Sequence, residues 1–247
     1  MNAKVWLVGA GPGDPELLTL KAVRALNNAD VVLIDDLVNP AVLEHCPVAR
    51  IIPVGKRGGC RSTPQAFIHR LMLRYARQGK TLVRLKGGDP CIFGRGGEEA
   101  EWLARHGVEA ELVNGITAGL AGATRCGISL THRGVARGVT LVTAHTQDDS
   151  SLNWQALAQT GTTLVVYMGV TRMDQVQAGL LQGGLPASTP VAMIENASLP
   201  EQRECRSRLD AMLLDAAAFG LRSPAVLVIG EVAAQGMDTM VSLARSA

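Results

Sequence analysis

Short apolar runs alternate with amphipathic segments along the first half of the chain. The apolar runs predict strands over Val5–Val8, Val31–Ile34, Arg50–Val54, Thr81–Leu85 and Ala110–Val113. Between them, the spacing of apolar positions predicts helices over Leu17–Leu26, Gln65–Arg77 and Glu98–His106. We expect Asp14 and Pro15 to start the first helix, and Glu98, Glu99 and Glu101 to lie in the first turn of the third. This alternation is typical of an α/β unit with a largely parallel sheet.

The pattern restarts after Asn114-Gly115. Strands are predicted over Thr140–Thr143, Thr162–Met168, Val191–Glu195, Glu204–Arg208 and Ala225–Ile229, and helices over Thr117–Cys126, Trp154–Gln159, Arg172–Leu181 and Leu209–Ala218. The loop Ala197–Gln202 joins two neighbouring strands, which indicates a hairpin and a mixed sheet. The fold class predicted is therefore α/β, with two α/β domains spanning residues 1–115 and 116–247.

Composition excludes several classes of protein. Hydrophobic residues make up 47% of the chain and charged residues 19%, which excludes disorder. Aromatic residues make up only 3%, which argues against single-stranded nucleic-acid binding, and a net charge of +2 provides no field for DNA or a membrane. The five cysteines form no CxxC pair and the five histidines are scattered, so we expect no disulfide framework and no metal. Without a signal peptide or a membrane span, the expected location is the reducing cytoplasm.

Charge is unevenly distributed even though its total is small. Between Val48 and Gly97 there are eleven Lys and Arg residues and one acid, Asp89. Between Leu112 and Gln147 there is no acid, while Arg125, Arg133 and Arg137 are present. The bias indicates either a small anionic ligand or two basic surfaces.

Three glycine-containing loops follow predicted strands. They are Gly9-Ala10-Gly11-Pro12-Gly13-Asp14, Leu85-Lys86-Gly87-Gly88-Asp89-Pro90 and Asn114-Gly115-Ile116-Thr117-Ala118. Glycine lets the backbone approach a ligand closely, and ligands of open α/β sheets bind beyond the carboxyl ends of the strands. Asp14 and Pro12 argue against a dinucleotide fingerprint, because an acid there would repel a pyrophosphate. The loops therefore indicate a binding site of another kind, the alternative being that each glycine merely marks a tight turn.

At these positions the sequence resembles the tetrapyrrole (corrin/porphyrin) methylases. The motifs GAGPGDP, LKGGDPCIFGRGGEE, NGITAG and SLTHR occur in that family's order and spacing, and the resemblance runs from Val5 to Ala233. Ile34-Asp35-Asp36-Leu37-Val38 and Val54-Gly55-Lys56-Arg57 resemble the branch that acts on uroporphyrinogen III. The resemblance implies a homodimer of two-domain chains with S-adenosylmethionine in the cleft between the domains. It also implies methylation of uroporphyrinogen III at C2 and C7, through precorrin-1 to precorrin-2, with S-adenosylhomocysteine as the other product.

The family's functional residues carry over to matching positions. Cofactor contacts are implied for Pro12, Gly87, Gly88, Asp89, Ile92, Thr117, Ala118, Met168 and Ala197. Relatives carry glycine where Ala197 stands, so a backbone contact there requires a negative φ and room for the methyl group. The resemblance makes Asp35 the proton acceptor and Lys56 the proton donor. The alternatives are a turn cap for Asp35, an exchange of roles with Asp36, and a solvated loop charge for Lys56.

A tetrapyrrole with acetate and propionate arms requires cationic partners, which arginine provides best because it binds carboxylates bidentately. Arg57, Arg95 and Arg133 are the candidates, and Glu98 either orients an arginine or binds a pyrrole N–H. No metal is expected in the reaction. The competing hypotheses are a methylase of another precorrin, of diphthine or of ribosomal RNA, an NAD-dependent oxidoreductase, and a nucleotide-binding module without catalysis. Sirohaem, cobalamin and haem d1 synthesis all remain open as the pathway that uses the product.

Overall fold

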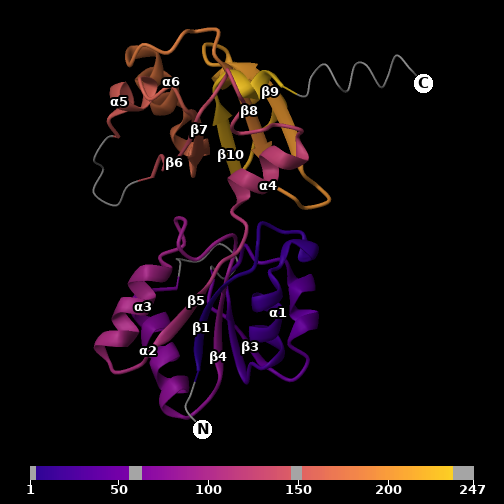
Figure 1. Ribbon diagram of the computed structural model, residues 1–247, viewed down its shortest axis with the longest axis vertical. Coiled ribbons are helices and arrows are strands. Elements are labelled where there is room, and N and C mark those ends of the chain that lie inside the picture. Colours follow the sequence, from indigo (N-terminus) through magenta and orange to yellow (C-terminus); the bar gives the residue numbers. More distant parts are fainter. Residues whose placement is uncertain (1–3, 56–62, 146–151, 236–247) are drawn as a thin grey trace, which may run out of the picture. The chain divides into compact units, whose positions relative to one another are not determined.

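A computed structural model describes residues 4–55, 63–145 and 152–235 of the chain. The chain divides into two compact units, Met1–Thr117 and Ala118–Ala247, each built around a five-stranded sheet (Figure 1). The predicted fold class, two α/β domains, is confirmed. No helix in the described ranges is long and apolar enough to cross a membrane.

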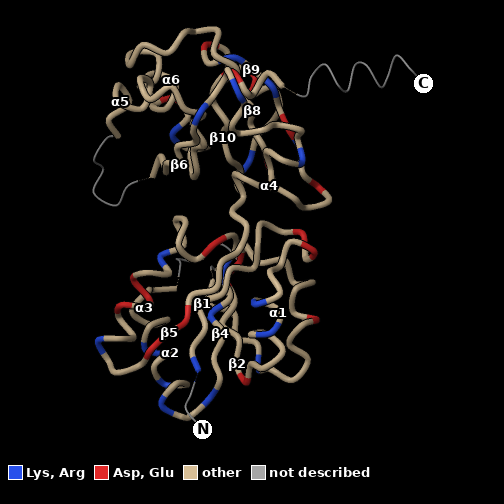
Figure 2. The backbone as a smooth tube through the Cα atoms, in the orientation of Figure 1, with Lys and Arg blue, Asp and Glu red and all other residues tan. Residues whose placement is uncertain are grey.

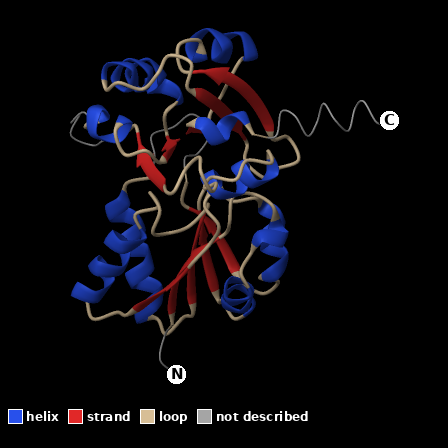
Figure 3. Ribbon diagram, turned by 45° about the horizontal axis from the view of Figure 1, so that its top comes forward, coloured by secondary structure: helices blue, strands red, loops and turns tan. Residues whose placement is uncertain are grey.

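The first unit contains an entirely parallel sheet with helices on both faces (Figure 3). Its strands are β1 (Val5–Gly9), β2 (Val31–Ile34), β3 (Arg50–Pro53), β4 (Leu82–Lys86) and β5 (Ala110–Val113), in the order β3-β2-β4-β1-β5. The helices are α1 (Leu20–Asn27), α2 (Gln65–Arg77) and α3 (Gly96–Arg105), together with the short 3-10 helices η1 (Pro15–Leu17) and η2 (Pro40–His45). One core cluster lies under α1 and η2, and another under α2 and α3. Because the strands are parallel, all five carboxyl ends lie at one edge of this sheet.

The start of the first helix differs from the prediction. Asp14 and Pro15 start the 3-10 helix η1, where the Asp14 side chain accepts a hydrogen bond from the Glu16 N–H at 2.9 Å. The α-helix begins later, at Leu20, and its cap is Thr19, whose hydroxyl accepts from the Ala22 N–H at 3.1 Å. Two capping residues five positions apart therefore divide what the apolar pattern predicts as one helix.

The second unit contains a mixed sheet. Its strands are β6 (Val139–Thr143), β7 (Thr163–Tyr167), β8 (Pro190–Glu195), β9 (Arg203–Arg208) and β10 (Ala225–Ile229), in the order β6-β7-β10-β8-β9. Only β6 and β7 pair in parallel, and β8 and β9 form the predicted hairpin, with Glu195 opposite Arg203. The helices are α4 (Ala118–Arg125), α5 (Trp154–Ala158), α6 (Met173–Gln182) and α7 (Met212–Phe219), with the 3-10 helices η3 (Val170–Arg172) and η4 (Glu231–Ala234). Residues of α5, α6 and α7 pack over one face, and residues of α4 and η4 over the other.

Candidate active site

The three glycine loops meet at the carboxyl edge of the first sheet. They follow β4, β1 and β5, which are neighbours in that order. Gly11 and Gly88 form an isolated antiparallel bridge, in which the Gly88 N–H donates to the Gly11 carbonyl at 2.7 Å and the Gly11 N–H donates to the Gly88 carbonyl at 3.2 Å. The first and second loops are thus joined backbone to backbone, as their common position after parallel strands predicts.

This close approach requires glycine at Gly9 and Gly115. A Cβ added to Gly115 would lie 2.2 Å from the Gly88 carbonyl oxygen, and one added to Gly9 would lie 2.6 Å from the Gly115 nitrogen. Both contacts are with backbone, which cannot rotate away as a side chain can. The glycines of the first and third loops therefore do more than permit a turn, because they allow the three loops to touch.

Asp89 ties two of these loops together. Its side chain is buried, and its Oδ2 accepts from the Gly115 N–H at 3.1 Å and from the Asn114 amide at 3.2 Å. Its Oδ1 accepts from the Cys91 N–H at 2.7 Å. Both carboxylate oxygens thus have partners within the protein, so Asp89 shapes the loops whatever else it contacts.

A buried group of charges lies beside these loops, on the α2 and α3 side of the sheet. Arg84 and Lys86 of β4 are 2% and 5% exposed, and Glu99 of α3 is 0% exposed. Arg84 Nη2 lies 2.6 Å from Asp35 Oδ1, and Lys86 Nζ lies 3.1 Å from Glu99 Oε1 and 3.8 Å from Asp35 Oδ2. Burial lowers the pKa of Lys86, as does Arg84, while Glu99 and Asp35 oppose that change. We call these four residues the Asp35 cluster.

The neighbouring acids Asp35 and Asp36 have different surroundings. The Asp35 carboxylate turns toward two buried cations, whereas Asp36 is exposed and its carboxylate lies against Gly55, where an added Cβ would be 1.9 Å from Asp36 Oδ1. The interpretation of Asp35 as a simple turn cap does not account for its 2.6 Å contact with Arg84. Lys56 and Arg57, the predicted proton donor and its neighbour, lie outside the described residues.

Arg95 and Glu98 form an exposed ion pair at the start of α3. Arg95 Nη2 lies 2.7 Å from Glu98 Oε2, and Arg95 Nε also donates to both carboxylate oxygens. This hydrogen bonding raises the pKa of Arg95 and lowers that of Glu98, so the contact favours the charged form of both side chains. Arg95 has a left-handed backbone, with φ 59°, as does nearby Phe93 with φ 54°. Such conformations are costly for residues other than glycine and concentrate at functional sites.

In the second unit, the segments that carry Ala118 and Met168 lie together. The Gly119 N–H donates to the Tyr167 hydroxyl at 2.9 Å, which joins the start of α4 to the end of β7. Met168, directly after β7, is 48% exposed and has φ 53°. Met168 is therefore not part of the hydrophobic core of this unit.

The structure accommodates alanine at position 197, where relatives carry glycine. Asn196 and Ser198 on either side have φ 53° and 64°, but Ala197 itself does not take a left-handed conformation. Its methyl group is buried in the core, and a Cβ added to Gly122 would come within 3.1 Å of it. The missing side chain at Gly122 therefore provides the room that Ala197 uses.

The remaining predicted residues lie at loops and element ends. In the first unit, Pro12, Gly87 and Ile92 are half-buried and Thr117 is buried; in the second, Arg133 is exposed. Arg125, from the stretch without acids, donates to the Ser198 carbonyl at 2.7 Å and the Leu199 carbonyl at 2.9 Å. It therefore holds the loop around Ala197. Within the described ranges, no group of three His, Cys, Asp or Glu side chains is placed to hold a metal ion.

The model of the tetrapyrrole (corrin/porphyrin) methylases matches residues 4–213. The chain belongs to this family. A uroporphyrinogen-III C-methyltransferase of Pseudomonas aeruginosa is 73% identical over 243 residues, which cover 98% of this chain and 99% of that protein. A protein of the same name from Pseudomonas fluorescens is 70% identical over 247 residues and the whole of both chains. A uroporphyrin-III C-methyl transferase from Thermus thermophilus, solved in complex with S-adenyl homocysteine, is 44% identical, with a TM-score of 0.81 and 94% of each chain covered.

Sequence reasoning did not single out Arg84, Lys86 or Asn114 in this methylase, and it assigned Glu99 to the helix dipole. The sequence from Thr81 to Lys86, one residue longer than the predicted strand Thr81–Leu85, nevertheless contained a signal. A strand covered on both faces normally reads as a continuous apolar run, and here two cations stand two positions apart, hence on one face. The buried cations required a buried acid, which α3 supplies as Glu99. Glu101, also predicted in the first turn, lies beyond it and pairs with Arg105 at the surface.

The basic bias along the methylase chain has two separate explanations. Arg84 and Lys86 belong to the buried cluster, whereas Arg70, Arg74 and Arg77 are exposed along α2. Lys and Arg residues, blue in Figure 2, are spread over both units.

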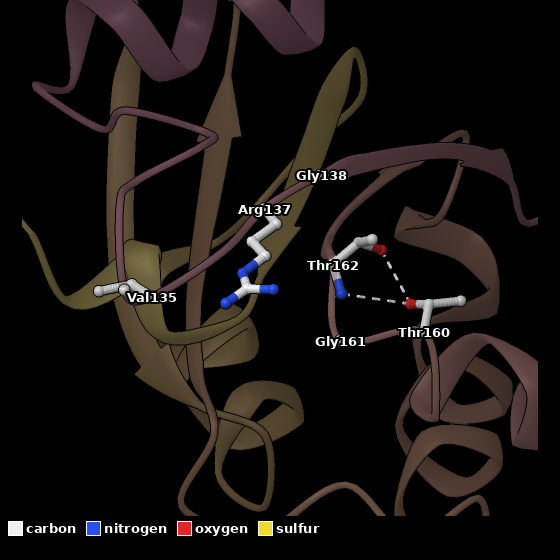
Figure 4. A pocket seen from close by; sticks show the side chains of 7 residues that line it. Val135, Arg137, Gly138, Thr160, Gly161 and Thr162 are labelled. Carbon is white, nitrogen blue, oxygen red and sulfur yellow. Dashed lines mark hydrogen bonds between the residues drawn. The ribbon is translucent and has the colours of Figure 1, made fainter.

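Arg137 lines a hollow of about 350 Å³ in the second unit, beside Val135 and the hydrogen-bonded Thr160 and Thr162 (Figure 4). None of the predicted site residues lines this hollow.

Proposed function

We propose that this chain transfers methyl groups from S-adenosylmethionine to uroporphyrinogen III, at C2 and then C7, to give precorrin-2 through precorrin-1. The observation that carries the proposal is the 73% identity to a uroporphyrinogen-III C-methyltransferase along 98% of this chain. Every motif that resembles this branch of the family falls within that span, and the family's loops form a tight backbone assembly at one sheet edge. A methylase of another precorrin, of diphthine or of ribosomal RNA would share the family fold but is not favoured by such identity.

Residues of the first unit fit a bound S-adenosylmethionine. Gly88 has φ 69°, and a Cβ added there would approach Thr117, the nearest atoms being its Cα at 3.8 Å and Oγ1 at 4.0 Å. The missing side chain leaves the space beside Thr117 open to the close approach of a ligand. We assign the cofactor contacts to Pro12, Gly87, Gly88, Asp89, Ile92 and Thr117 of the first unit and to Ala118, Met168 and Ala197 of the second. The product left in this site is S-adenosylhomocysteine.

When bound, S-adenosylmethionine supplies an electrophilic methyl group, and the pyrrole carbon of a porphyrinogen is the nucleophile. The protein orients the reactants and excludes water, effects that together contribute up to about 7–11 kcal/mol in well-aligned reactions. A proton must also leave as the ring system rearranges. We assign acceptance of this proton to Asp35, which Arg84 contacts at 2.6 Å, and we assign the role of proton donor to Lys56.

We assign recognition of the substrate's carboxylates to Arg57, Arg95 and Arg133. Arg95 supports this role because its guanidinium is exposed, ionised and oriented by Glu98. Of the two roles open to Glu98, orienting an arginine is the one that its hydrogen bonds to Arg95 favour. No metal takes part in this assignment.

Arg95→Ala is expected to weaken substrate binding about tenfold, because a hydrogen bond to a charged group contributes roughly 1.5–3 kcal/mol when shielded and less when exposed. Affinity for S-adenosylmethionine should not change, since Arg95 is not among the cofactor residues. The measurements are the KM for uroporphyrinogen III and calorimetric titration of the cofactor. Arg105→Ala, which removes an exposed arginine from the same helix, is the matched control. Equal loss of both affinities would contradict the assignment.

The proposal extends to assembly and location. We propose a homodimer, as the resemblance implies, in a reducing cytoplasm, where the described cysteines Cys46, Cys91, Cys126 and Cys205 stay free thiols. Small-molecule tetrapyrrole is the proposed partner, with neither nucleic acid nor membrane involved. The product is an intermediate suited to sirohaem, cobalamin or haem d1 synthesis.

The decisive experiment is anaerobic incubation of the protein with uroporphyrinogen III and ¹³C-methyl S-adenosylmethionine. Mass analysis should find two added methyl groups, and ¹³C NMR should place them at C2 and C7. Cofactor binding without methyl transfer would favour a nucleotide-binding module, and methylation of a different precorrin alone would contradict the substrate. Hydride transfer to NAD in a parallel assay would instead support an oxidoreductase.

A further inference from the structure

The Asp35 cluster places charged side chains in the centre of a parallel sheet, where apolar side chains are usual. β4 is the middle strand, and on its α2 and α3 side Leu82 is followed by Arg84 and then Lys86, all buried. Removing a charge from water costs several kcal/mol even after relaxation, and a buried ion pair often stabilises a fold no more than apolar residues of similar size. Stability alone therefore gives little reason to place two cations here.

The contacts of Arg84 lead from the core to the sheet edge. Its Nε donates to Glu99 Oε1 at 3.4 Å and its Nη1 to the Leu33 carbonyl at 3.4 Å, so the guanidinium is restrained within the sheet. Its Nη2 then donates to Asp35 Oδ1 at 2.6 Å. Asp35 is the one member of the cluster with substantial exposure, 28% of its side chain. The hydrogen bonds of Arg84 therefore end on the Asp35 carboxylate, at the carboxyl edge of the first sheet.

Glu99 supports the arrangement from α3. Its Oε1 accepts from Lys86 at 3.1 Å and from the Gln65 amide of α2 at 2.8 Å, while its buried Oε2 has no hydrogen-bond partner among the described residues. One Glu99 oxygen thus accepts all of these hydrogen bonds. The arrangement gives both cations a partner, although the other Glu99 oxygen has none among the described residues. The cluster thus brings two basic and two acidic side chains into direct contact.

We propose that Arg84, braced by Glu99, is a positioning residue that holds the Asp35 carboxylate in one orientation for proton acceptance. This inference rests on the proposed function and on the role assigned to Asp35. Arg84 acts through Asp35 and does not itself contact substrate. The same bracing makes Glu99 a second positioning residue, one step further from the reaction.

The test is a double-mutant cycle on turnover with Arg84→Met, Asp35→Asn and the double variant. Arg84→Met should lower kcat about 10²-fold, the scale expected when a catalytic group is misplaced by about 1 Å, with KM and cofactor affinity unchanged. In the Asp35→Asn background, Arg84→Met should lower kcat by less than about threefold, because the residue through which it acts is already disabled. Full additivity of the two losses would overturn the proposal, as would normal turnover of Arg84→Met.

Arg84→Lys and Glu99→Gln keep the test decisive if Arg84→Met does not fold. Arg84→Lys retains the charge without the guanidinium fork and should recover part of the lost turnover. Glu99→Gln should lower kcat, whereas Glu101→Gln, the same change on the exposed side of α3, should not. Equal turnover of Glu99→Gln and Glu101→Gln would overturn the bracing role. A wild-type protein that does not methylate uroporphyrinogen III would instead overturn the proposed function, and with it this inference.

Discussion

Gly115→Ala is expected to lower the free energy of unfolding by about 3 kcal/mol, the upper end of the range for overpacking a tight interior. The added Cβ would lie 2.2 Å from the Gly88 carbonyl oxygen and 2.9 Å from both Gly9 Cα and its carbonyl carbon. Because these are backbone atoms of two other loops, relief requires the loops to separate. For a chain of this size, such a loss corresponds to a fall in Tm of roughly 6–12 °C.

The same change should also weaken cofactor binding, because separating the loops moves Gly88 and Thr117 from their places. Thermal denaturation and calorimetric titration with S-adenosylhomocysteine measure the two effects. Gly97→Ala is the matched control, since a Cβ at Gly97 in α3 meets nothing within 4 Å. Alanine there should stabilise the helix by about 0.5–1 kcal/mol. If the Gly115→Ala protein were as stable as the Gly97→Ala protein, the inference that the three loops pack closely would be contradicted.

Asp35→Asn is expected to reduce kcat by about 10²–10⁴-fold, the range that a positioned acid–base group contributes. Asparagine keeps the size and shape of the side chain but loses the negative charge that accepts a proton and pairs with Arg84. Substrate KM and cofactor affinity should change little, because carboxylate and cofactor recognition are assigned to other residues. Single-turnover assays under anaerobic conditions measure the chemical step directly.

Asp36→Asn is the control that the sequence itself offers. It is the same substitution one position along, on an exposed side chain that lies against Gly55 and outside the Asp35 cluster. Its effect should stay within about 0.5 kcal/mol, or about twofold in rate, as for most surface substitutions. A large loss in Asp36→Asn with normal turnover in Asp35→Asn would exchange the roles of the two acids.

Local patterns predicted much of this architecture. Helix α2 begins and ends at the predicted residues because its apolar positions follow a helical period, and strand β2 does so because it is a continuous apolar run with polar flanks. The hairpin of β8 and β9 followed from the short loop Ala197–Gln202, which joins two neighbouring predicted strands. The prediction of where α1 begins was wrong, because capping is decided by the geometry of single side chains, which an apolar period does not reveal.

By itself, then, the sequence determined the two α/β domains, the order of their elements and the motifs that identify the family. These features depend on contacts between near neighbours in the chain and on residue types at fixed spacing. Only the tertiary structure decided that Gly115 touches Gly88, that Asp89 joins two loops, and that Asp35 faces Arg84 while Asp36 does not. Those pairings join segments between 26 and 49 positions apart, and their partners are chosen by burial, which makes an unpaired charge or a crowded backbone too costly to tolerate.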